Sequence, residues 1–258
     1  MRPELSAVFA NPDVVEAYQY RPPYPPEVFD VLEELITDQP RHVLDIGAGD
    51  GALARPLAEL VDRVDAVDVS AAMLAAGARQ PGGDRPNLRW ILGSAETAEL
   101  AGPYALVTAG ASLHWMDWEQ MLPRLAAEGT GHAFLAIVDH GVQAAPWRDA
   151  VREVIVRHSR SNNFDPSFSL PDELSARGLL KISGSATSQD VPFRQSVASY
   201  IEQFHSTASL ARLWMAEEES VAFDRAIGQA VRPYATDGML EMAVVAAITW
   251  GRPVAAAR

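Results

Sequence analysis

Three glycines stand at alternate positions after an apolar run in the stretch VLDIGAGDG, namely Gly47, Gly49 and Gly51. Glycine in such a turn costs backbone entropy, so its presence indicates that another group comes close to the main chain. The helix expected to begin at Gly51 would offer free backbone N–H groups to a ligand. Asp68 lies 21 residues after Gly47, where a carboxylate can accept hydrogen bonds from ribose hydroxyls. The spacing therefore predicts a site for a cofactor that contains a nucleoside.

The class of nucleoside is less tightly specified by this turn. The stretch GAGDGA, which ends at Ala52, also fits the dinucleotide pattern G-x-G-x-x-A, so NAD is an open alternative on this motif alone. Asp45, however, stands two residues before the first glycine, where its carboxylate would repel a pyrophosphate and suit a ligand with an ammonium group. Met73 follows Asp68 by five residues, and GSAE (93–96) follows the third expected strand. Together these features disfavour a nicotinamide cofactor.

The scaffold that must position these residues is predicted to alternate strands and helices. Residues 12–37 indicate helical pieces separated by prolines. From residue 41 onward, the pattern predicts strands at 42–46, 63–69, 88–92, 104–109 and 132–138, and helices at 51–61 and 70–80. Such alternation is typical of a parallel sheet, in which ligands bind beyond the carboxyl ends of the strands. The glycine turn and Asp68 follow the first two strands and therefore share that edge.

After residue 139 the alternation is lost. A helix is expected at 146–159, a strand-like segment at 182–197, a largely helical block at 197–235 and a last strand at 240–250. Because the helical block stands between two late strands, it is interpreted as an inserted cap rather than as an independent domain.

Four segments in order, VLDIGAGDG, AVDVSAAML, GSAE and YALVTAGASLHWMDW, resemble the class I S-adenosylmethionine-dependent methyltransferases. The likeness is nearest to the small-molecule branch typified by trans-aconitate methyltransferases, and it covers residues 18–140 well and the remainder more loosely. It implies an α/β fold with a Rossmann-like, seven-stranded, mostly parallel sheet, helices on both faces and a last strand antiparallel to the sixth. One methyltransferase domain is expected over 1–258, with N-terminal lid helices at 1–40, a cofactor-binding core at 41–140 and a C-terminal part at 141–258 whose cap covers about 197–236.

The resemblance implies S-adenosyl-L-methionine as the cofactor. Gly47 and its neighbours would face the methionine part, and Asp68 would hold the ribose hydroxyls. Met73 would pack on adenine or, as an equal alternative, belong to the helix core. Ser94 departs from the family, which often has an aspartate there. The residues expected to bind cofactor are Tyr18, Arg21, Asp45, Gly47, Ala48, Gly49, Asp68, Val69, Met73, Ser94, Ala95, Glu96, Ala109 and Gly110.

Two histidines are candidates for a general base. His114, in LHWMDW after the fourth strand, titrates near neutral pH and could remove a proton from an acceptor. Asp117 could orient that imidazole or cap the following helix, whereas Trp115 is expected to form a wall of the pocket. His140, after the fifth strand, is a second candidate. For His114, the alternative role of a packing residue beside the cofactor has the same weight as the role of a general base.

The resemblance implies that two further segments reach the site, because in this branch a leading segment folds over the methionine end of the cofactor and the cap lies over the active site. In YQYRPPYP, Arg21 could pair with the cofactor carboxylate or an acidic substrate, and Tyr18 or Tyr20 could close over the site. The alternative is a proline-stiffened surface loop. From the predicted cap, the expected acceptor contacts are Phe204, His205 and Trp214.

The composition narrows the possible partners. The net charge of −13, without any Lys/Arg run, argues against nucleic acid, and no apolar run is long enough to span a membrane. There is no cysteine for a disulfide, a thiolate metal site or a nucleophile, and no metal is expected. A cytoplasmic protein without a secretory signal is expected, as a monomer or a homodimer.

The expected reaction is methyl transfer to a small organic molecule in bacterial secondary metabolism, with oxygen favoured over nitrogen or carbon as the acceptor atom. Oxygen is favoured by elimination, since the chain has no NPPY motif for amino groups and no cysteine for attack on a pyrimidine. Three alternatives are open: an S-adenosylmethionine-binding enzyme of another type such as a cyclase, an NAD-dependent oxidoreductase, and a binding module without catalysis.

Overall fold

The computed structural model describes residues 7–143, 145–161 and 168–255, and the chain divides into two compact units. The sheet unit comprises Tyr24–His140, Ser167–Gln189 and Ala246–Arg258. The helical unit comprises Met1–Pro23, Gly141–Pro166 and Asp190–Val245. The core predicted at 41–140 lies within the sheet unit, whereas the predicted lid and C-terminal parts are divided between the two units. The expectation that all parts form one domain stays a prediction.

The sheet unit contains most of the strands found in the described residues. Its strands are β1 (His42–Ile46), β2 (Arg63–Asp68), β3 (Leu88–Leu92), β4 (Tyr104–Gly110), β5 (Gly129–Val142), β6 (Leu180–Thr187) and β8 (Met239–Pro253), and β5 and β8 continue into the helical unit. Its helices are α3 (Glu27–Glu34), α4 (Ala54–Leu57), α5 (Ala71–Ala78), α6 (Trp118–Glu128) and α8 (Leu170–Ala176), with the short 3-10 helix η3 (Leu113–Trp115).

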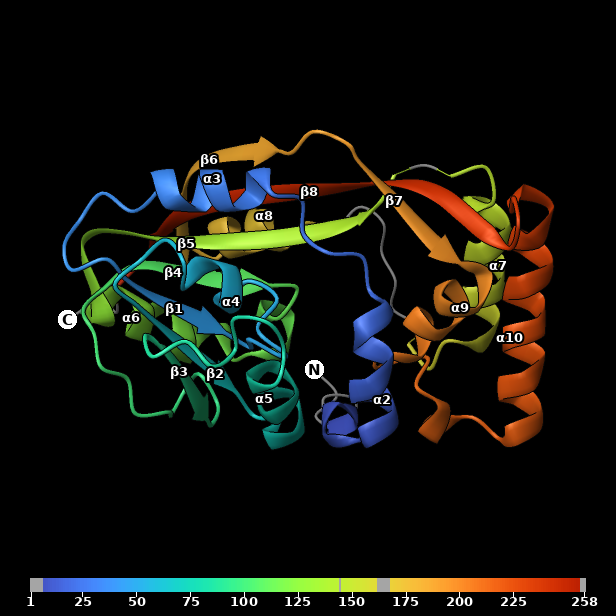
Figure 1. The fold of residues 1–258 in the computed structure, drawn as a ribbon. Helices are drawn as coiled ribbons and strands as arrows, with labels where there is room; N and C mark the ends of the chain where they lie inside the picture. Colours follow the sequence, from blue (N-terminus) through green and yellow to red (C-terminus); the bar gives the residue numbers. More distant parts are fainter. Residues whose placement is uncertain (1–6, 144, 162–167, 256–258) are drawn as a thin grey trace. The chain divides into compact units, whose positions relative to one another are not determined.

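The strand order is β3-β2-β1-β4-β5-β8-β6 (Figure 1). Neighbouring strands from β3 through β5 are parallel, and β6 is antiparallel to β8. The predicted α/β fold with a mostly parallel sheet is therefore confirmed, as is a last strand antiparallel to the sixth.

The sheet has eight strands where seven were expected. The strand-like segment at 182–197 forms two strands, β6 and β7 (Val191–Ser196), because the polar residues between them leave the strand path. Ser188 in that break exchanges two hydrogen bonds with Ala246, at 2.9 and 3.0 Å. β8 is long enough to pair with β7 along its first part and with β6 along its second.

The helix that follows β1 begins later than expected. The sequence predicted a helix at 51–61, but α4 spans only Ala54–Leu57. Gly51 has φ +77°, a left-handed conformation that a right-handed helix does not include. The residues before α4 therefore form turns, and the glycine turn is longer than predicted.

Both faces of the parallel strands are buried. Successive residues of a strand point to opposite faces, and Val43 and Leu44 of β1 accordingly belong to different hydrophobic clusters. Helices α3 and α4 contribute to the cluster around Val43, whereas α6 and α8 contribute to the cluster around Leu44 (Figure 1). Packing on both faces holds these strands in place and so positions the strand ends at which the candidate site lies.

The helical unit packs its helices on a separate core. Its elements are η1 (Ala7–Ala10), α2 (Pro12–Ala17), η2 (Tyr18–Tyr20), α7 (Arg148–His158), β7, α9 (Val197–His205), η4 (Arg212–Trp214), α10 (Glu217–Val231) and η5 (Arg232–Tyr234). Phe223 and Ile227 of α10 are fully buried in a cluster with Val151 of α7 and Tyr200 of α9. The helical character predicted for 197–235 is confirmed.

Within the described ranges, no helix has both the length and the apolar character needed to cross a membrane.

Candidate active site

The glycine turn after β1 has three residues in the left-handed region. Gly47, Gly49 and Gly51 have φ values of 63°, 58° and 77°. A Cβ on Gly47 would lie 2.5 Å from the Cβ of Ser112, which is closer than real side chains approach one another. The Ala48 N–H also donates to the carbonyl oxygen of Val67 at 3.0 Å. The turn is thus pressed against the ends of β2 and of the segment that follows β4, and only glycine fits its first position.

Asp68, at the end of β2, holds this turn in place. One carboxylate oxygen accepts the Gly49 N–H at 2.8 Å, and the other accepts the Ser70 N–H at 2.8 Å. Burial raises the pKa of Asp68, and these backbone hydrogen bonds oppose the rise. A carboxylate has about four lone-pair positions, so Asp68 can accept further hydrogen bonds from a ligand. The predicted contact with ribose hydroxyls stays a prediction that this geometry permits.

Two apolar side chains are exposed beside Asp68. Val69 and Leu92 each have 62% of their surface exposed, and Leu92 is the register partner of Asp68 in the β2–β3 ladder. Exposed aliphatic residues at the carboxyl edge of a parallel sheet offer a surface for a flat apolar group. Leu92 was missed by the sequence analysis, although its place at the end of the third predicted strand was a usable signal. Met73, by contrast, is 1% exposed, as expected for the helix-core alternative.

The loop after β3 is connected to the start of α6. Ser94 is bound to Thr97, with 2.9 Å between their side-chain oxygens. Ala95 is buried, and its carbonyl oxygen accepts a hydrogen bond from Arg124 at 2.7 Å. Glu96 accepts the backbone N–H of Asp117 at 3.0 Å. These contacts fix the loop, and a role of its residues at the adenine edge stays a prediction.

Asp45 lies beneath the turn and is 2% exposed. One of its oxygens accepts a hydrogen bond from the Thr108 hydroxyl at 2.7 Å, and burial raises the pKa of Asp45 to about 7. In the structure, the hydrogen-bond partner of the Asp45 carboxyl group is therefore Thr108 on the neighbouring strand β4. Direct contact with an ammonium group of a ligand stays a prediction.

We expect Asp45→Asn to remove a pH dependence of stability. The unfolded carboxyl ionises near its usual pKa of 3.8, whereas the folded one keeps its proton to about pH 7. Between these pH values the folded chain binds more protons than the unfolded chain. The contribution of Asp45 to the free energy of unfolding therefore falls as the pH rises, and it is constant above the folded pKa. Urea denaturation should therefore show that the stability of Asp45→Asn relative to the unsubstituted chain increases across this window. Asp84→Asn, at an exposed loop carboxylate, should show no such trend, and a flat difference for Asp45→Asn would contradict the buried neutral carboxyl.

The first candidate base, His114, lies in η3 beside Trp115, with 4.7 Å between the ring centroids. The residue is exposed to solvent, yet partial desolvation lowers the pKa of His114, and the carboxylate of Asp139 opposes this shift. Its imidazole is therefore neutral at neutral pH and can accept a proton. Asp117 is the N-cap of α6 and accepts the Gln120 N–H at 3.2 Å, which is the capping alternative of the sequence analysis.

The second candidate, His140, packs on a tyrosine that the sequence analysis did not single out. The rings of Tyr24 and His140 lie 4.0 Å apart between centroids. The Tyr24 hydroxyl also lies 2.6 Å from the position that a Cβ on Gly110 would occupy. Ala109, before that glycine, is fully buried in β4. Tyr24 belongs to the predicted YQYRPPYP segment, and its packing places it at the carboxyl ends of β4 and β5.

The remaining predicted residues lie in the helical unit. Arg21 donates to the side chain and backbone of Ser206, at 2.7 and 2.9 Å, and its guanidinium lies 4.0 Å from the centroid of the Tyr18 ring. The Tyr20 carbonyl oxygen accepts a hydrogen bond from Gln195 at 2.6 Å. These contacts are within the unit, and roles toward the cofactor carboxylate or the acceptor stay predictions.

Three predicted acceptor contacts also have partners inside the helical unit. Phe204 packs edge-on against Tyr200, and the Trp214 carbonyl oxygen accepts a hydrogen bond from Arg160 at 2.8 Å. His205 is 2% exposed, with its Nδ1 2.9 Å from the Leu210 carbonyl oxygen and its Nε2 2.7 Å from Asp224. For His205, binding an acceptor would require one of these hydrogen bonds to break.

Among the residues that the structure describes, no group of three or more His, Cys, Asp or Glu side chains is placed to hold a metal ion.

Comparison with protein families matches residues 43–143 to the model described as a methyltransferase domain. An uncharacterized methyltransferase of Mycobacterium tuberculosis is 36% identical over 110 residues, which cover 42% of this chain and 55% of that protein. The chain therefore spans about half the length of the curated relatives that it matches.

Solved methyltransferase structures share the fold. A protein described as a type II methyltransferase, from Anaeromyxobacter dehalogenans, has a TM-score of 0.66 at 21% identity, covering 92% of this chain and 99% of that chain. A SAM-dependent methyltransferase from Thiobacillus denitrificans, solved with S-adenosyl-L-homocysteine, has a TM-score of 0.55 at 14% identity, covering 94% and 97%. At these identities the likeness shows the fold alone.

Proposed function

We propose that this chain, whose residues 43–143 belong to a methyltransferase domain family, is a class I S-adenosylmethionine-dependent methyltransferase. The observation that carries the proposal is the crowded glycine turn held by Asp68. A Cβ at Gly47 would collide with Ser112, so glycine lets the turn pack closely at the carboxyl edge of the sheet, and the hydrogen bond from Gly49 to Asp68 holds the turn there. The Thiobacillus denitrificans neighbour with S-adenosyl-L-homocysteine supports the choice of cofactor.

The residues of the sheet unit fit the parts of such a cofactor. Gly47 and Gly49 would lie along its methionine part, and Asp68 would accept hydrogen bonds from its ribose hydroxyls. Val69, which follows Asp68 in the chain, and Leu92, the register partner of Asp68 on β3, are exposed and would form the surface for adenine. When bound, the sulfonium group supplies an electrophilic methyl group.

For methyl transfer, the chain must position the acceptor, exclude water and remove one proton. We place the acceptor oxygen of a small organic molecule near His114, because this imidazole is neutral at neutral pH and lies at the carboxyl edge of the sheet. His114 would take the hydroxyl proton as the oxygen–methyl bond forms and the sulfur–methyl bond breaks, with S-adenosylhomocysteine as the leaving group. An acceptor of the trans-aconitate type, and a place in secondary metabolism, belong to this proposal and follow only from the resemblance.

Calorimetry with S-adenosylhomocysteine and with NAD is the first test of the proposal. Saturable binding of the former without the latter is expected, and the absence of S-adenosylhomocysteine binding would overturn the assignment. Turnover with candidate hydroxyl and carboxyl compounds then follows S-adenosylhomocysteine release and product mass. Cofactor consumption with a product that carries no added methyl group would identify another reaction type, such as cyclisation.

For His114→Asn we expect kcat to fall by about a hundredfold or more, since general base catalysis contributes about that much. S-adenosylhomocysteine affinity should change little. Because the neutral imidazole is the active form and its pKa is lowered, activity of the unsubstituted chain should rise with pH, with its midpoint below the usual pKa of histidine. This rise of activity with pH should be absent in His114→Asn and present in His140→Asn. Unchanged kcat in His114→Asn would assign the base role elsewhere.

A further inference from the structure

A cavity of about 750 Å³ lies within the helical unit. Its size is in the usual range for small-molecule sites. Most of its wall comes from α7, and Tyr200 and Phe204 of α9 complete it. The lining residues on which the argument depends are Trp147, Arg148, Val151, Arg152, Tyr200 and Phe204.

Three aromatic side chains give this cavity an apolar, preorganised wall. The Trp147 indole N–H donates to the Tyr200 hydroxyl at 3.1 Å, so the polar atoms of these two rings satisfy each other. Tyr200 and Phe204 are arranged edge to face, with 5.3 Å between centroids. Val151 and Ile155, one turn apart on α7, add aliphatic surface. Such a wall favours a ligand with an aromatic or aliphatic body.

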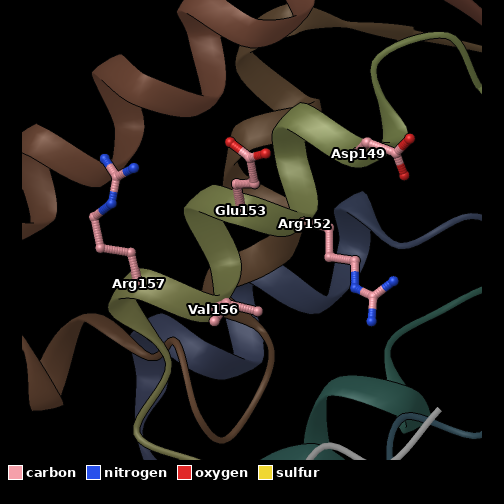
Figure 2. Close-up of a pocket in the computed structure, with 5 residues that line it drawn as sticks. All are labelled: Asp149, Arg152, Glu153, Val156 and Arg157. Carbon is pink, nitrogen blue, oxygen red and sulfur yellow. The ribbon is translucent and has the colours of Figure 1, made fainter.

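The charged side chains of the cavity are both basic. Arg148 and Arg152 stand four residues apart on α7, so they lie on one face of the helix, and none of the lining residues is acidic. Arg152 also borders a shallower hollow on α7 with Asp149 and Glu153, and Figure 2 shows Arg152 and Glu153 projecting to different sides of the helix. Arg148 lines the larger cavity and not the shallower hollow, so it is the main candidate for holding an anion in the larger cavity.

We propose that this cavity binds a molecule with an apolar, aromatic body and a single anionic group, which Arg148 and Arg152 hold. Guanidinium groups pair with planar anions through two parallel hydrogen bonds. The site shares Phe204 with the predicted acceptor contacts, but its ligand binding does not depend on methyl transfer.

Naphthoate and its uncharged counterpart naphthylmethanol, titrated into the full chain by calorimetry, test the proposal. Saturable binding of naphthoate, about tenfold tighter than that of the alcohol, is expected from charge-assisted hydrogen bonds. Arg148→Gln/Arg152→Gln should abolish this preference, whereas Arg157→Gln, at an exposed position of α7 that does not line the cavity, should keep it. Ile155→Trp should reduce binding of both compounds by filling the cavity, with circular dichroism as the check on folding.

Further measurements separate an acceptor from a second ligand. Incubation with S-adenosylmethionine and naphthoate yields a methyl ester if the anion is the acceptor, and no ester if the cavity serves another ligand; both results support the site. No saturable naphthoate binding to the unsubstituted chain, equal affinity for the alcohol, or an equal loss in Arg157→Gln would overturn it. Because these titrations contain no cofactor, their outcome is independent of whether S-adenosylhomocysteine binds.

Discussion

Replacing Gly47 by alanine is expected to lower the affinity for S-adenosylhomocysteine by about a hundredfold. The new Cβ would lie 2.5 Å from the Cβ of Ser112 and 3.2 Å from the Met116 methyl group. Relief of that overlap costs about 1–3 kcal/mol in a packed site, and the left-handed φ of 63° adds about 1–2 kcal/mol. The turn would have to move, and its N–H groups would move with it. Calorimetry at one temperature, with circular dichroism for folding, measures the loss.

Two companion variants separate crowding from backbone strain. Gly178 also has a left-handed φ, 70°, but no atom lies within 4 Å of an added Cβ, so Gly178→Ala carries only the backbone cost. It should leave cofactor affinity unchanged while lowering stability slightly. Adding Ser112→Gly to Gly47→Ala removes the nearest obstacle and should restore part of the affinity. If Gly47→Ala binds as tightly as the unsubstituted chain, the turn is not where the cofactor lies.

The parallel strands could be predicted from the sequence because their signal is local. Strands buried on both faces appear as short apolar runs between turn residues, and β1 to β4 lie within one residue of their expected bounds. The β6–β7 break could not be predicted in this way. It depends on which residues of β8 each strand meets, and β8 is distant in the sequence. The start of α4 was missed for a different reason, since the left-handed conformation of Gly51 is set by the fold around it.

The candidate site was predictable only where it is built from consecutive residues. The glycine turn and Asp68 are such cases, and their mutual hydrogen bond agrees with the spacing that indicated them. Ser112 and Tyr24 were missed because each reaches the site through packing between separate segments, whereas Leu92 ends a predicted strand and could have been found. The structure also gives Asp45 a partner, Thr108, that no local pattern indicates.

Asp68→Asn should lower S-adenosylhomocysteine affinity by at least about tenfold, although it preserves the side-chain shape. The two oxygens of Asp68 accept N–H groups on opposite sides, from Gly49 and Ser70. An asparagine has one oxygen and one NH2 group, so one of these N–H donors would face another donor. Leaving a buried donor unpaired costs about 1–3 kcal/mol, and the turn at Gly49 would be released. Asp84→Asn, the same change at an exposed loop position, should leave the affinity unchanged.

The same variant can separate a contact with ribose from support of the turn. An analogue of S-adenosylhomocysteine without ribose hydroxyls should bind the unsubstituted chain more weakly than the parent compound. If Asp68 accepts hydrogen bonds from those hydroxyls, Asp68→Asn should nearly abolish the difference between the two ligands; if it only supports the turn, the difference should persist at lower affinity. Acidification provides a second measure, because burial raises the pKa of Asp68 and its ionised form is the better acceptor. Affinity should therefore fall on acidification earlier than for a solvent-exposed carboxylate, and Asp68→Asn should lack that fall.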